Sequence, residues 1–273
     1  MPELPEVETV RRVLAPHLLK RKITDVQIKN AQVIVSPLPE QFAERMRGQI
    51  ISDFTRRGKF LRLCFASGDF LTIHLRMTGC LTVEPRLTPA EKHTHIVFSL
   101  NDENELRYED VRRLGKMYFT PKGGSDTSGA EKLGVEPFDG ALTATYLRSN
   151  CENSKKPVKS MLLDQSIVAG IGNIYSDEIL FAAHIRPERP CNALLGEEFE
   201  RLAAAIPERL AYFIEKNAVS FEDYALSKGK DYRNTPFLQV YGRSGEACPF
   251  CGGALQRTVL GGRSSVFCPH CQR

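Results

Sequence analysis

The chain has 273 residues, of which 42% are hydrophobic, and this is enough for one large domain or two modest ones. Its 37 Lys and Arg residues against 33 Asp and Glu residues give a net charge of +4, which is compatible with a polyanionic partner but too small to require one. No apolar run reaches membrane-spanning length, and the first residues lack the pattern of an export signal. Eight cysteines in such a chain predict a reduced cytosolic protein whose thiols are ligands or core residues.

The first segment predicts a helix over residues 6–19. Pro5 lies near its first turn, and the acidic Glu3 and Glu6 lie at its N-terminal end, where the helix dipole favours carboxylates. The apolar residues that follow helical spacing are Val7, Val10, Val13, Leu14 and Leu18.

Short alternating segments then predict a β-sandwich or a barrel. The expected strands cover residues 23–28, 50–54, 60–65, 70–75, 95–100, 106–108 and 117–119. After a Gly- and Ser-rich loop over residues 122–129, helices are expected over residues 142–149, 158–164, 174–183 and 195–217. The last forty residues are again β-like around the cysteines, so the order is β-rich, then helical, then a small metal module.

Two Cys-x-x-Cys pairs, separated by sixteen residues, predict a metal site near the C-terminus. Each pair presents two thiolates from one tight turn, and two such turns make a tetrahedral site suited to zinc. A pair of redox dithiols is the alternative, but two matched pairs around a short hairpin argue against it. Because protein fills all four positions, we expect one structural zinc ion, held by Cys248, Cys251, Cys268 and Cys271.

The Met1-Pro2 start carries the main indication of chemistry. Removal of the methionine would leave the secondary amine of Pro2, with an α-amino pKa of roughly 8. Such an amine can attack a sugar C1′ and form an iminium, which withdraws electrons and acidifies the C2′–H bond. A Met-Pro start taken alone is more often without meaning, so the surrounding residues decide.

Three further segments are weak signals when taken singly. Lys59 lies in a basic cluster before an apolar strand, and residues 92–95 repeat this pattern with two histidines. Arg263 follows two glycines at the expected tip of the cysteine hairpin, where it can hold a phosphate. Each of these is equally typical of a solvated surface.

A glycine-rich turn, Gly170-Ile171-Gly172, leads into the helix that begins near Asn173. Free N–H groups at a helix start, together with the Asn173 side chain, predict an anion site of the kind that holds phosphate. A dinucleotide-binding fold would need a preceding strand, and the sequence shows none.

Together these segments resemble bacterial formamidopyrimidine-DNA glycosylases over essentially the whole chain. The shared motifs are the start Pro2-Glu3-Leu4-Pro5-Glu6-Val7-Glu8-Thr9, Arg57-Gly58-Lys59, His74-Leu75-Arg76-Met77, Asp110-Val111-Arg112-Arg113, Gly170-Ile171-Gly172-Asn173-Ile174-Tyr175 and the four-cysteine ribbon. The resemblance implies an α+β fold with an N-terminal helix plus β-sandwich (1–133), a helix–two-turn–helix domain (134–235) and a zinc ribbon (236–273), with DNA in the cleft between the lobes.

The resemblance also implies a bifunctional DNA glycosylase and AP lyase. It removes oxidised purines from double-stranded DNA and cleaves the abasic site by β,δ-elimination. Pro2 would be the Schiff-base nucleophile and Glu3 the acid that protonates the opening sugar, while Lys59 and Arg263 would hold phosphates and assist the eliminations. Met77, Arg112 and Leu114 would fill the gap left by the flipped nucleotide, because the base cannot be read within an intact stack. The full set of expected DNA contacts is His74, Met77, His93, Arg112, Leu114, Lys155 and Asn173. A monomer on the bacterial nucleoid is expected.

Three positions depart from the family pattern. Leu114 replaces an aromatic residue, Thr78 replaces an acid or serine, and the lesion-capping loop over residues 217–224 lacks its glycines and carries Glu222 at a basic position. The preferred lesion therefore stays open between 8-oxoguanine, formamidopyrimidines and other damaged bases. The altered loop also leaves a second reading, a non-catalytic damaged-DNA-binding protein, although such a protein would not need Pro2, Glu3 and Lys59 together. A zinc-ribbon transcription factor would not explain the N-terminus.

Overall fold

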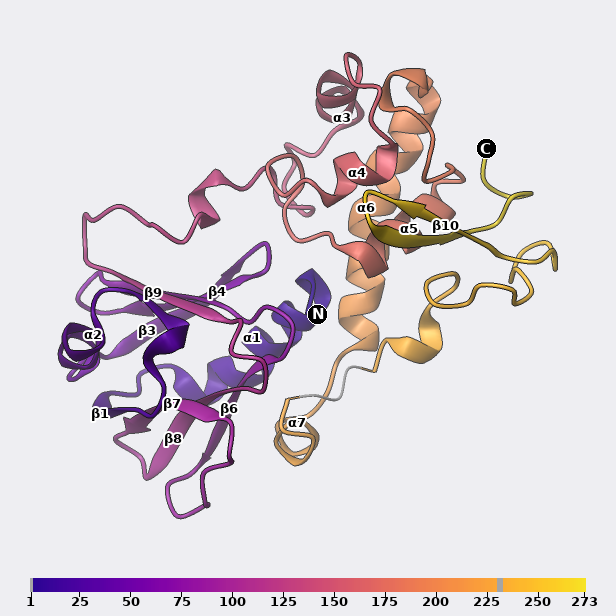
Figure 1. Cartoon of the computed structure of the whole chain (residues 1–273). Helices are drawn as coiled ribbons and strands as arrows, with labels where there is room; N and C mark the ends of the chain where they lie inside the picture. The colour runs from indigo at the N-terminus through magenta and orange to yellow at the C-terminus, as the bar shows by residue number, and fades with distance from the viewer. Residues whose placement is uncertain (1, 230–232) are drawn as a thin grey trace. The chain divides into compact units, whose positions relative to one another are not determined.

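The computed structural model describes residues 2–229 and 233–273, which form two compact units (Figure 1). The first unit comprises Pro2, residues 6–131 and residues 217–229. The second comprises residues 3–5, 132–216 and 233–273. The chain therefore enters each unit more than once, and the candidate site residues are distributed between them.

The described residues of the first unit form two mostly antiparallel sheets and three α-helices. One sheet has the strand order β2-β9-β5-β4-β3 and the other the order β1-β7-β8-β6, and only β2 and β9 pair in parallel. Its elements are α1 (Leu4–Leu18, from Glu6 onward), β1 (Ile23–Ile28), β2 (Ile34–Ser36), α2 (Pro39–Met46), β3 (Ile51–Arg57), β4 (Phe60–Phe65), β5 (Phe70–His74), β6 (Gly79–Pro85), β7 (Thr94–Leu100), β8 (Asn104–Asp110), β9 (Lys116–Thr120) and α7 (Phe221–Leu226).

Both sheets of this unit share one hydrophobic core. In β4 buried and half-buried residues alternate, as expected when one face of a strand packs inward. Leu61 and Phe54 of the five-stranded sheet and Phe98 of the four-stranded sheet join the same buried cluster as Leu14 and Leu18 of α1. The two layers with a common core confirm the predicted sandwich.

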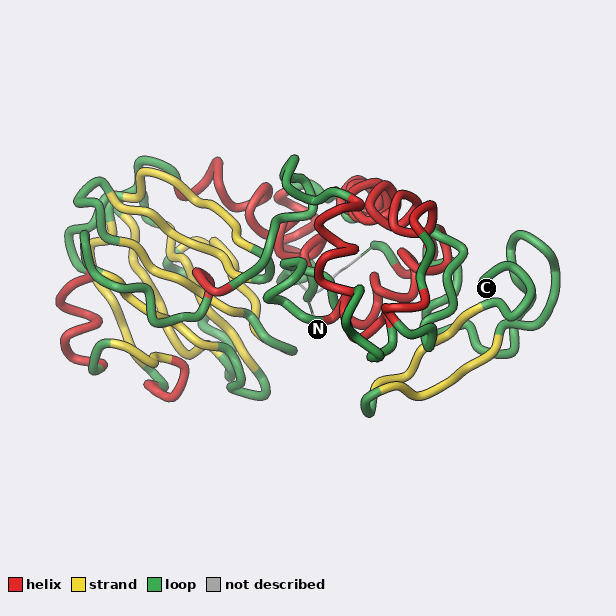
Figure 2. Tube along the Cα trace, turned by 90° about the horizontal axis from the view of Figure 1, so that it is seen from above, coloured by secondary structure: helices red, strands yellow, loops and turns green. Residues whose placement is uncertain are grey.

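The second unit is helical and ends in a two-stranded ribbon. Its helices pack around apolar residues such as Leu162, Ile179 and Leu202, and a separate small cluster lies under the ribbon. Figure 2 shows the ribbon strands as a hairpin closed by a short loop. The elements are α3 (Ala144–Cys151), α4 (Val158–Leu163), α5 (Asn173–Ala182), α6 (Gly196–Lys216), β10 (Gln256–Leu260) and β11 (Arg263–Phe267).

Every predicted strand and helix has a counterpart, but the structure adds β2, α2, β6 and α7. The helix α7 lies in the segment that the sequence reading treated only as a loop. Ser220 is its N-cap, since the hydroxyl accepts a hydrogen bond from the Asp223 N–H at 3.1 Å. Among the described residues, no helix has both the length and the apolar character needed to cross a bilayer.

Candidate functional site

The predicted site residues fall into two sets, one on each unit. The first unit carries Pro2, Lys59, His74, Met77, His93, Arg112 and Leu114, and the second carries Glu3, Lys155, Asn173, Arg263 and the four cysteines.

A cavity of about 300 Å³ adjoins Pro2, which is itself buried. Its walls are mostly apolar, and among the described lining residues Thr78 alone carries a hydroxyl group. The lining consists of Pro2, Met77, Thr78, Gly79, Cys80, Val111 and Gly229. Pro2 therefore lies against a mostly apolar space.

Lys59 lies on the two-residue turn that joins β3 to β4. Gly58 precedes it with φ of 54°, a left-handed conformation that glycine adopts at no steric cost. The Arg56 guanidinium donates to the Gly58 carbonyl at 3.1 Å and to Glu8 at 3.1 Å, so the turn is fixed to α1. Lys59 is only 8% exposed, so the surrounding protein restricts the movement of its side chain.

Glu8 binds three guanidinium groups, those of Arg11, Arg12 and Arg56. Burial alone would raise the pKa of this carboxyl, but hydrogen bonds from Arg11 and Arg12 and the nearby positive charges outweigh it and lower the pKa to about 2. The ionised Glu8 therefore links the N-terminal helix to the Lys59 turn at any neutral pH.

His74 ends β5 with its ring inside the protein. The ring packs edge-on against Phe60, with centroids 4.6 Å apart, and Nδ1 accepts a hydrogen bond from the Arg76 N–H at 3.0 Å. Burial, together with the charges of Arg76 and Lys59, lowers its pKa to about 3. The imidazole is therefore neutral, and it orders the turn that carries Met77.

Met77 and Arg112 lie on two turns that follow β5 and β8. The Arg112 Nη1 atom lies 3.0 Å from the Met77 sulfur. Met77, Val111 and Leu114 are 46%, 53% and 39% exposed, which is unusual for large apolar side chains gathered at strand ends. The sequence reading named two of these three and missed Val111.

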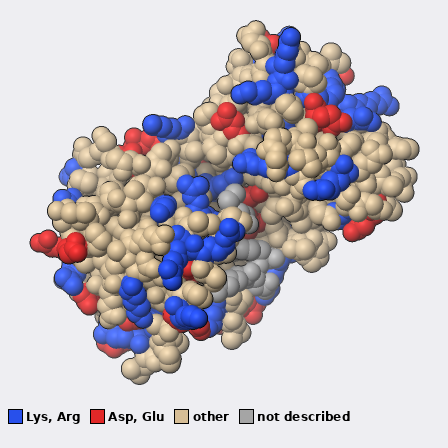
Figure 3. All heavy atoms as spheres, in the orientation of Figure 1, with Lys and Arg blue, Asp and Glu red and all other residues tan. Residues whose placement is uncertain are grey.

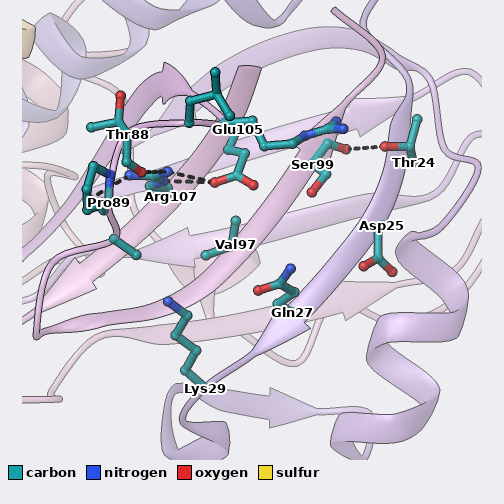
Figure 4. A pocket seen from close by; sticks show the side chains of 13 residues that line it. Thr24, Asp25, Gln27, Lys29, Thr88, Pro89, Val97, Ser99, Glu105 and Arg107 are labelled. Carbon is teal, nitrogen blue, oxygen red and sulfur yellow. Dashed lines mark hydrogen bonds and ion pairs between the residues drawn. The ribbon is translucent and has the colours of Figure 1, made fainter. Parts of the chain in front are cut away.

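His93 lies at the end of the connection between β6 and β7, half-buried. Buried Arg107 fixes this connection to the sheet, since its guanidinium donates to the Thr88 carbonyl at 2.6 Å and to Glu84 and Glu105 at 3.0 Å (Figure 4). A cavity of about 600 Å³ opens beside Arg107. Although it is larger than the cavity at Pro2, Arg107 already uses its donors within the protein, so we interpret this space as a consequence of the folded connection.

The segment predicted to cap the lesion packs on the first unit. The Tyr224 hydroxyl donates to the Leu81 carbonyl at 2.8 Å, and the Phe221 ring stacks on His17 with centroids 3.6 Å apart. Lys228 forms an ion pair with Glu91. Glu222, which stands where the family carries a basic residue, is exposed in the first turn of α7.

On the second unit, Glu3 caps the start of α5. Its carboxylate accepts hydrogen bonds from the N–H groups of Gly172, Ile174 and Tyr175 at 2.8, 3.0 and 3.3 Å, and Glu3 is only 2% exposed. This corrects the prediction that the N–H groups at this helix start are free, because the carboxylate of Glu3 already accepts hydrogen bonds from three of them.

Asn173 is the first residue of α5, and its buried side-chain oxygen has no hydrogen-bond partner among the residues that the structure describes. Lys155 is exposed in the connection between α3 and α4. The proposal that Asn173 and Lys155 contact phosphates stays a prediction.

Arg263 begins β11 directly after two left-handed glycines, Gly261 and Gly262, with φ of 54° and 76°. Two positive φ values in a two-residue loop are typical of a tight hairpin turn, and they leave the Arg263 side chain exposed. Ser264, the next residue, is held by Lys159. The buried Lys159 amine donates to the Ser264 carbonyl at 2.9 Å and to Asp177 at 2.7 Å.

Positive charge at these sites is local. Figure 3 shows Lys and Arg side chains on both units of the drawn face, interleaved with Asp and Glu. The face drawn there therefore carries charges of both signs, which agrees with the small net charge of the chain.

Comparison with known proteins decides the family. Residues 1–117 match the model of the formamidopyrimidine-DNA glycosylase N-terminal domain, and residues 133–224 match that of its H2TH domain. The chain is 46% identical to the formamidopyrimidine-DNA glycosylase of Moorella thermoacetica over 94% of each protein, and 42% identical to that of Geobacillus kaustophilus over the full length of both. The chain belongs to the formamidopyrimidine-DNA glycosylase family. Members of this family are bifunctional DNA glycosylases and AP lyases, so this chain is a DNA-repair enzyme.

Solved structures of this glycosylase family agree with the fold. Fpg of Lactococcus lactis in complex with DNA that contains an oxidised pyrimidine is 33% identical, with a TM-score of 0.89 over the whole of both chains. A MutM complex with DNA that contains carbocyclic 8-oxo-G is 34% identical, with a TM-score of 0.90 over the whole of both chains.

The glycosylase carries one structural zinc site. Residues 245–273 match a zinc finger found in these enzymes and in IleRS, and the four sulfur atoms all lie within 4.8 Å of one another. The Cys248–Cys271 and Cys251–Cys268 sulfur pairs are 3.9 and 3.5 Å apart. A tetrahedral zinc ion with bonds of about 2.3 Å requires sulfur separations of about 3.8 Å, so the cluster fits the ion.

Three residues that support the site were not predicted from the sequence. Asp110 was noticed only as part of a motif, and Lys159 and Asp177 were not noticed at all. Burial raises the pKa of Asp177 to about 6, although Lys159 opposes this shift. The available signal was that Asp177 and Glu178 are adjacent acids in a mostly apolar helix, because buried acids require partners.

Proposed function

We propose that this chain excises oxidised bases from double-stranded DNA and cleaves the resulting abasic site by β,δ-elimination through a Schiff base on Pro2. The supporting observation is the cavity of about 300 Å³ that adjoins Pro2, with Met77 among its walls. Formamidopyrimidine and 8-oxoguanine are the proposed lesions.

In this proposal the Pro2 nitrogen attacks C1′ as the bond from C1′ to the base breaks. Glu3, the next residue in the chain, protonates the opening sugar. The resulting iminium acidifies the C2′–H bond, and loss of that proton expels the 3′-phosphate. A second elimination expels the 5′-phosphate, and hydrolysis of the iminium frees Pro2.

The remaining candidates hold the DNA. Lys59 and Arg263 bind phosphates beside the lesion and assist the eliminations, and His93, Lys155 and Asn173 bind further phosphates. Met77, Arg112 and Leu114 enter the base stack, and neutral His74 supports the Met77 turn. We assign these roles to an N-terminal sandwich (1–133), a helix–two-turn–helix domain (134–235) and a zinc ribbon (236–273) of a monomer that works on the bacterial nucleoid.

The deciding experiment is reduction with borohydride in the presence of an abasic duplex. The expected product is a covalent adduct whose attached peptide begins with Pro2, and Pro2→Gly should abolish turnover while most DNA affinity remains. Absence of an adduct with abasic, 8-oxoguanine and formamidopyrimidine duplexes, or undiminished strand scission by protein that retains Met1, would contradict the proposal.

The altered capping segment favours one alternative, a damaged-DNA-binding protein without catalysis. Here α7 packs on β6 through Tyr224 and carries Glu222 outward. Nicking of abasic DNA separates the two functions. A panel of 8-oxoguanine, formamidopyrimidine, dihydrouracil and abasic duplexes then identifies the preferred lesion.

A further inference from the structure

Two turns of the first unit carry the apolar residues that the proposed function places in the base stack. Residues 75–78 connect β5 to β6 and carry Met77, and residues 111–115 connect β8 to β9 and carry Arg112 and Leu114. The strands that flank these turns are paired, with Gly79 opposite Asp110. The turns themselves lie beyond the ladder, so other bonds must order them.

The Asp110 carboxylate supplies those bonds. One of its oxygens accepts from the Thr78 hydroxyl and from the Arg112 N–H at 3.1 Å. The other accepts from the Gly115 N–H at 2.8 Å and the Tyr108 hydroxyl at 3.1 Å. Asp110 has no exposed surface, so these bonds form without competition from solvent.

Thr78 connects the two turns directly. Its hydroxyl donates to Asp110 and accepts from the Arg112 N–H at 3.1 Å, so one side chain of the first turn bonds twice to the second. A serine could make the same bonds, whereas valine would keep the shape and lose both.

The backbone around Asp110 extends the connection to a third segment. The Asp110 N–H donates to the His93 carbonyl at 3.0 Å, and Nε2 of His95 lies 2.7 Å from the Asp110 carbonyl. Asp110 therefore orders three segments that each carry a proposed DNA contact: Met77, His93 and Arg112.

Close packing leaves these turns little freedom to change. A Cβ atom added to Gly79 or Gly115 would lie 2.5 or 1.7 Å from the Tyr108 hydroxyl. Burial raises the pKa of Asp110, but the bonds from Thr78, Gly115, Tyr108 and Arg112 outweigh it and hold the pKa below its ordinary value. The carboxylate thus remains an acceptor throughout the neutral range.

We propose that Thr78 and Asp110 are positioning residues for the opening of duplex DNA: the Thr78–Asp110 pair holds the Met77 turn and the Arg112 turn together as one rigid wedge. The inference rests on the proposed function, in which these residues enter the stack. Unstacking a base costs free energy, and a wedge that is already ordered loses less conformational entropy when it enters the stack. Single-stranded DNA has no stack to open, so the pair matters only for duplex substrates.

The test compares Thr78→Val, Thr78→Ser and Met77→Ala with the parent enzyme on two substrates. One is a duplex with a single 8-oxoguanine or formamidopyrimidine and 2-aminopurine beside it, and the other is a single strand with one abasic site. We expect Thr78→Val to slow the 2-aminopurine fluorescence rise and duplex base excision about tenfold more than it slows scission of the single strand. Thr78→Ser, which keeps the hydroxyl, should retain the parental ratio of duplex to single-strand rates.

Two results would overturn the inference. Parental duplex opening by Thr78→Val would show that the pair is dispensable, and equal losses on both substrates would show a structural role instead. Met77→Ala separates this outcome from failure of the proposed function. If Met77→Ala slows duplex opening while Thr78→Val does not, only the positioning role is wrong. If Met77→Ala leaves duplex opening unchanged, the wedge itself is wrong and the inference fails with it.

Discussion

The Glu3 carboxylate lies against the backbone of Gly172, whose N–H donates to it at 2.8 Å. A Cβ atom at Gly172 would lie 2.4 Å from the Glu3 carboxyl, although the backbone there, with φ of −129°, accepts any residue. The glycine therefore serves the close approach of Glu3 rather than a special backbone conformation.

Gly172→Ala should displace Glu3 and reduce base excision about a hundredfold, because an error of about 1 Å in a catalytic group has this effect. The measurement is single-turnover excision from a duplex, with DNA affinity measured in parallel and expected to stay near the parent value. Gly196→Ala is the matched control, since no atom lies within 4 Å of its added Cβ. If Gly172→Ala excises the base at the rate of the parent enzyme, Glu3 takes no part in the chemistry.

His74 makes the stability of the protein sensitive to mild acid. Its pKa is about 3 when folded and roughly 6.5 when unfolded, so between these values the unfolded chain binds a proton that the native protein does not. The free energy of unfolding should therefore fall by about 2 kcal/mol through this group as the pH drops from 7 to 5.

His74→Asn, whose side-chain oxygen can replace Nδ1 as acceptor, should remove that share of the acid sensitivity. Urea unfolding of both proteins at pH 7 and pH 5 provides the measurement, and the other histidines cancel in the comparison. Equal pH dependence in the two proteins would mean that His74 is not buried as described.

Loss of the zinc site should disable DNA binding without unfolding the first unit. Cys251→Ser should retain less than one equivalent of zinc and lose DNA affinity more than tenfold, because Arg263 lies on the hairpin that the metal closes. Cys64→Ser, in β4 and outside the cluster, should keep one equivalent and parental affinity. Metal content and DNA titration are the readouts, and full affinity of zinc-free protein would contradict this expectation.

Removing one partner of the buried Lys159–Asp177 pair should lower the free energy of unfolding more than replacing both partners by apolar residues. Asp177→Asn leaves the Lys159 charge uncompensated at 0% exposure and should lower the free energy of unfolding of the second unit by about 3 kcal/mol. The double variant Lys159→Met, Asp177→Leu should lose less, since apolar groups then fill the same volume. Denaturant unfolding tests this, and a double variant less stable than Asp177→Asn would refute it.

Local patterns predicted much of the fold and of the candidate site. The apolar repeat from Val7 to Leu18 predicted α1, and the cysteine spacing alone predicted the zinc cluster, because both depend on neighbours in the chain. The sequence also predicted an anion site at the N-terminus of α5, but it did not show that the anion is the Glu3 carboxylate. Glu3 and Gly172 are 169 residues apart, and no local pattern reports such a contact.

The same limit explains α7 and Asp110. Six residues of helix at Phe221–Leu226 are too few for a clear repeat, and their order depends on Tyr224 and on Phe221 against His17. In the sequence, Asp110 is an acidic residue close to arginines, and nothing there indicates its partners. Only the folded turns show that Thr78, Tyr108 and Gly115 all donate to it.

The burial of Pro2 and Glu3 has a practical consequence for anyone who prepares this protein. The proposed chemistry needs a free amine on Pro2, and an affinity tag in front of this residue would turn that amine into an amide. A preparation that appears inactive should therefore be checked for leftover residues before Pro2.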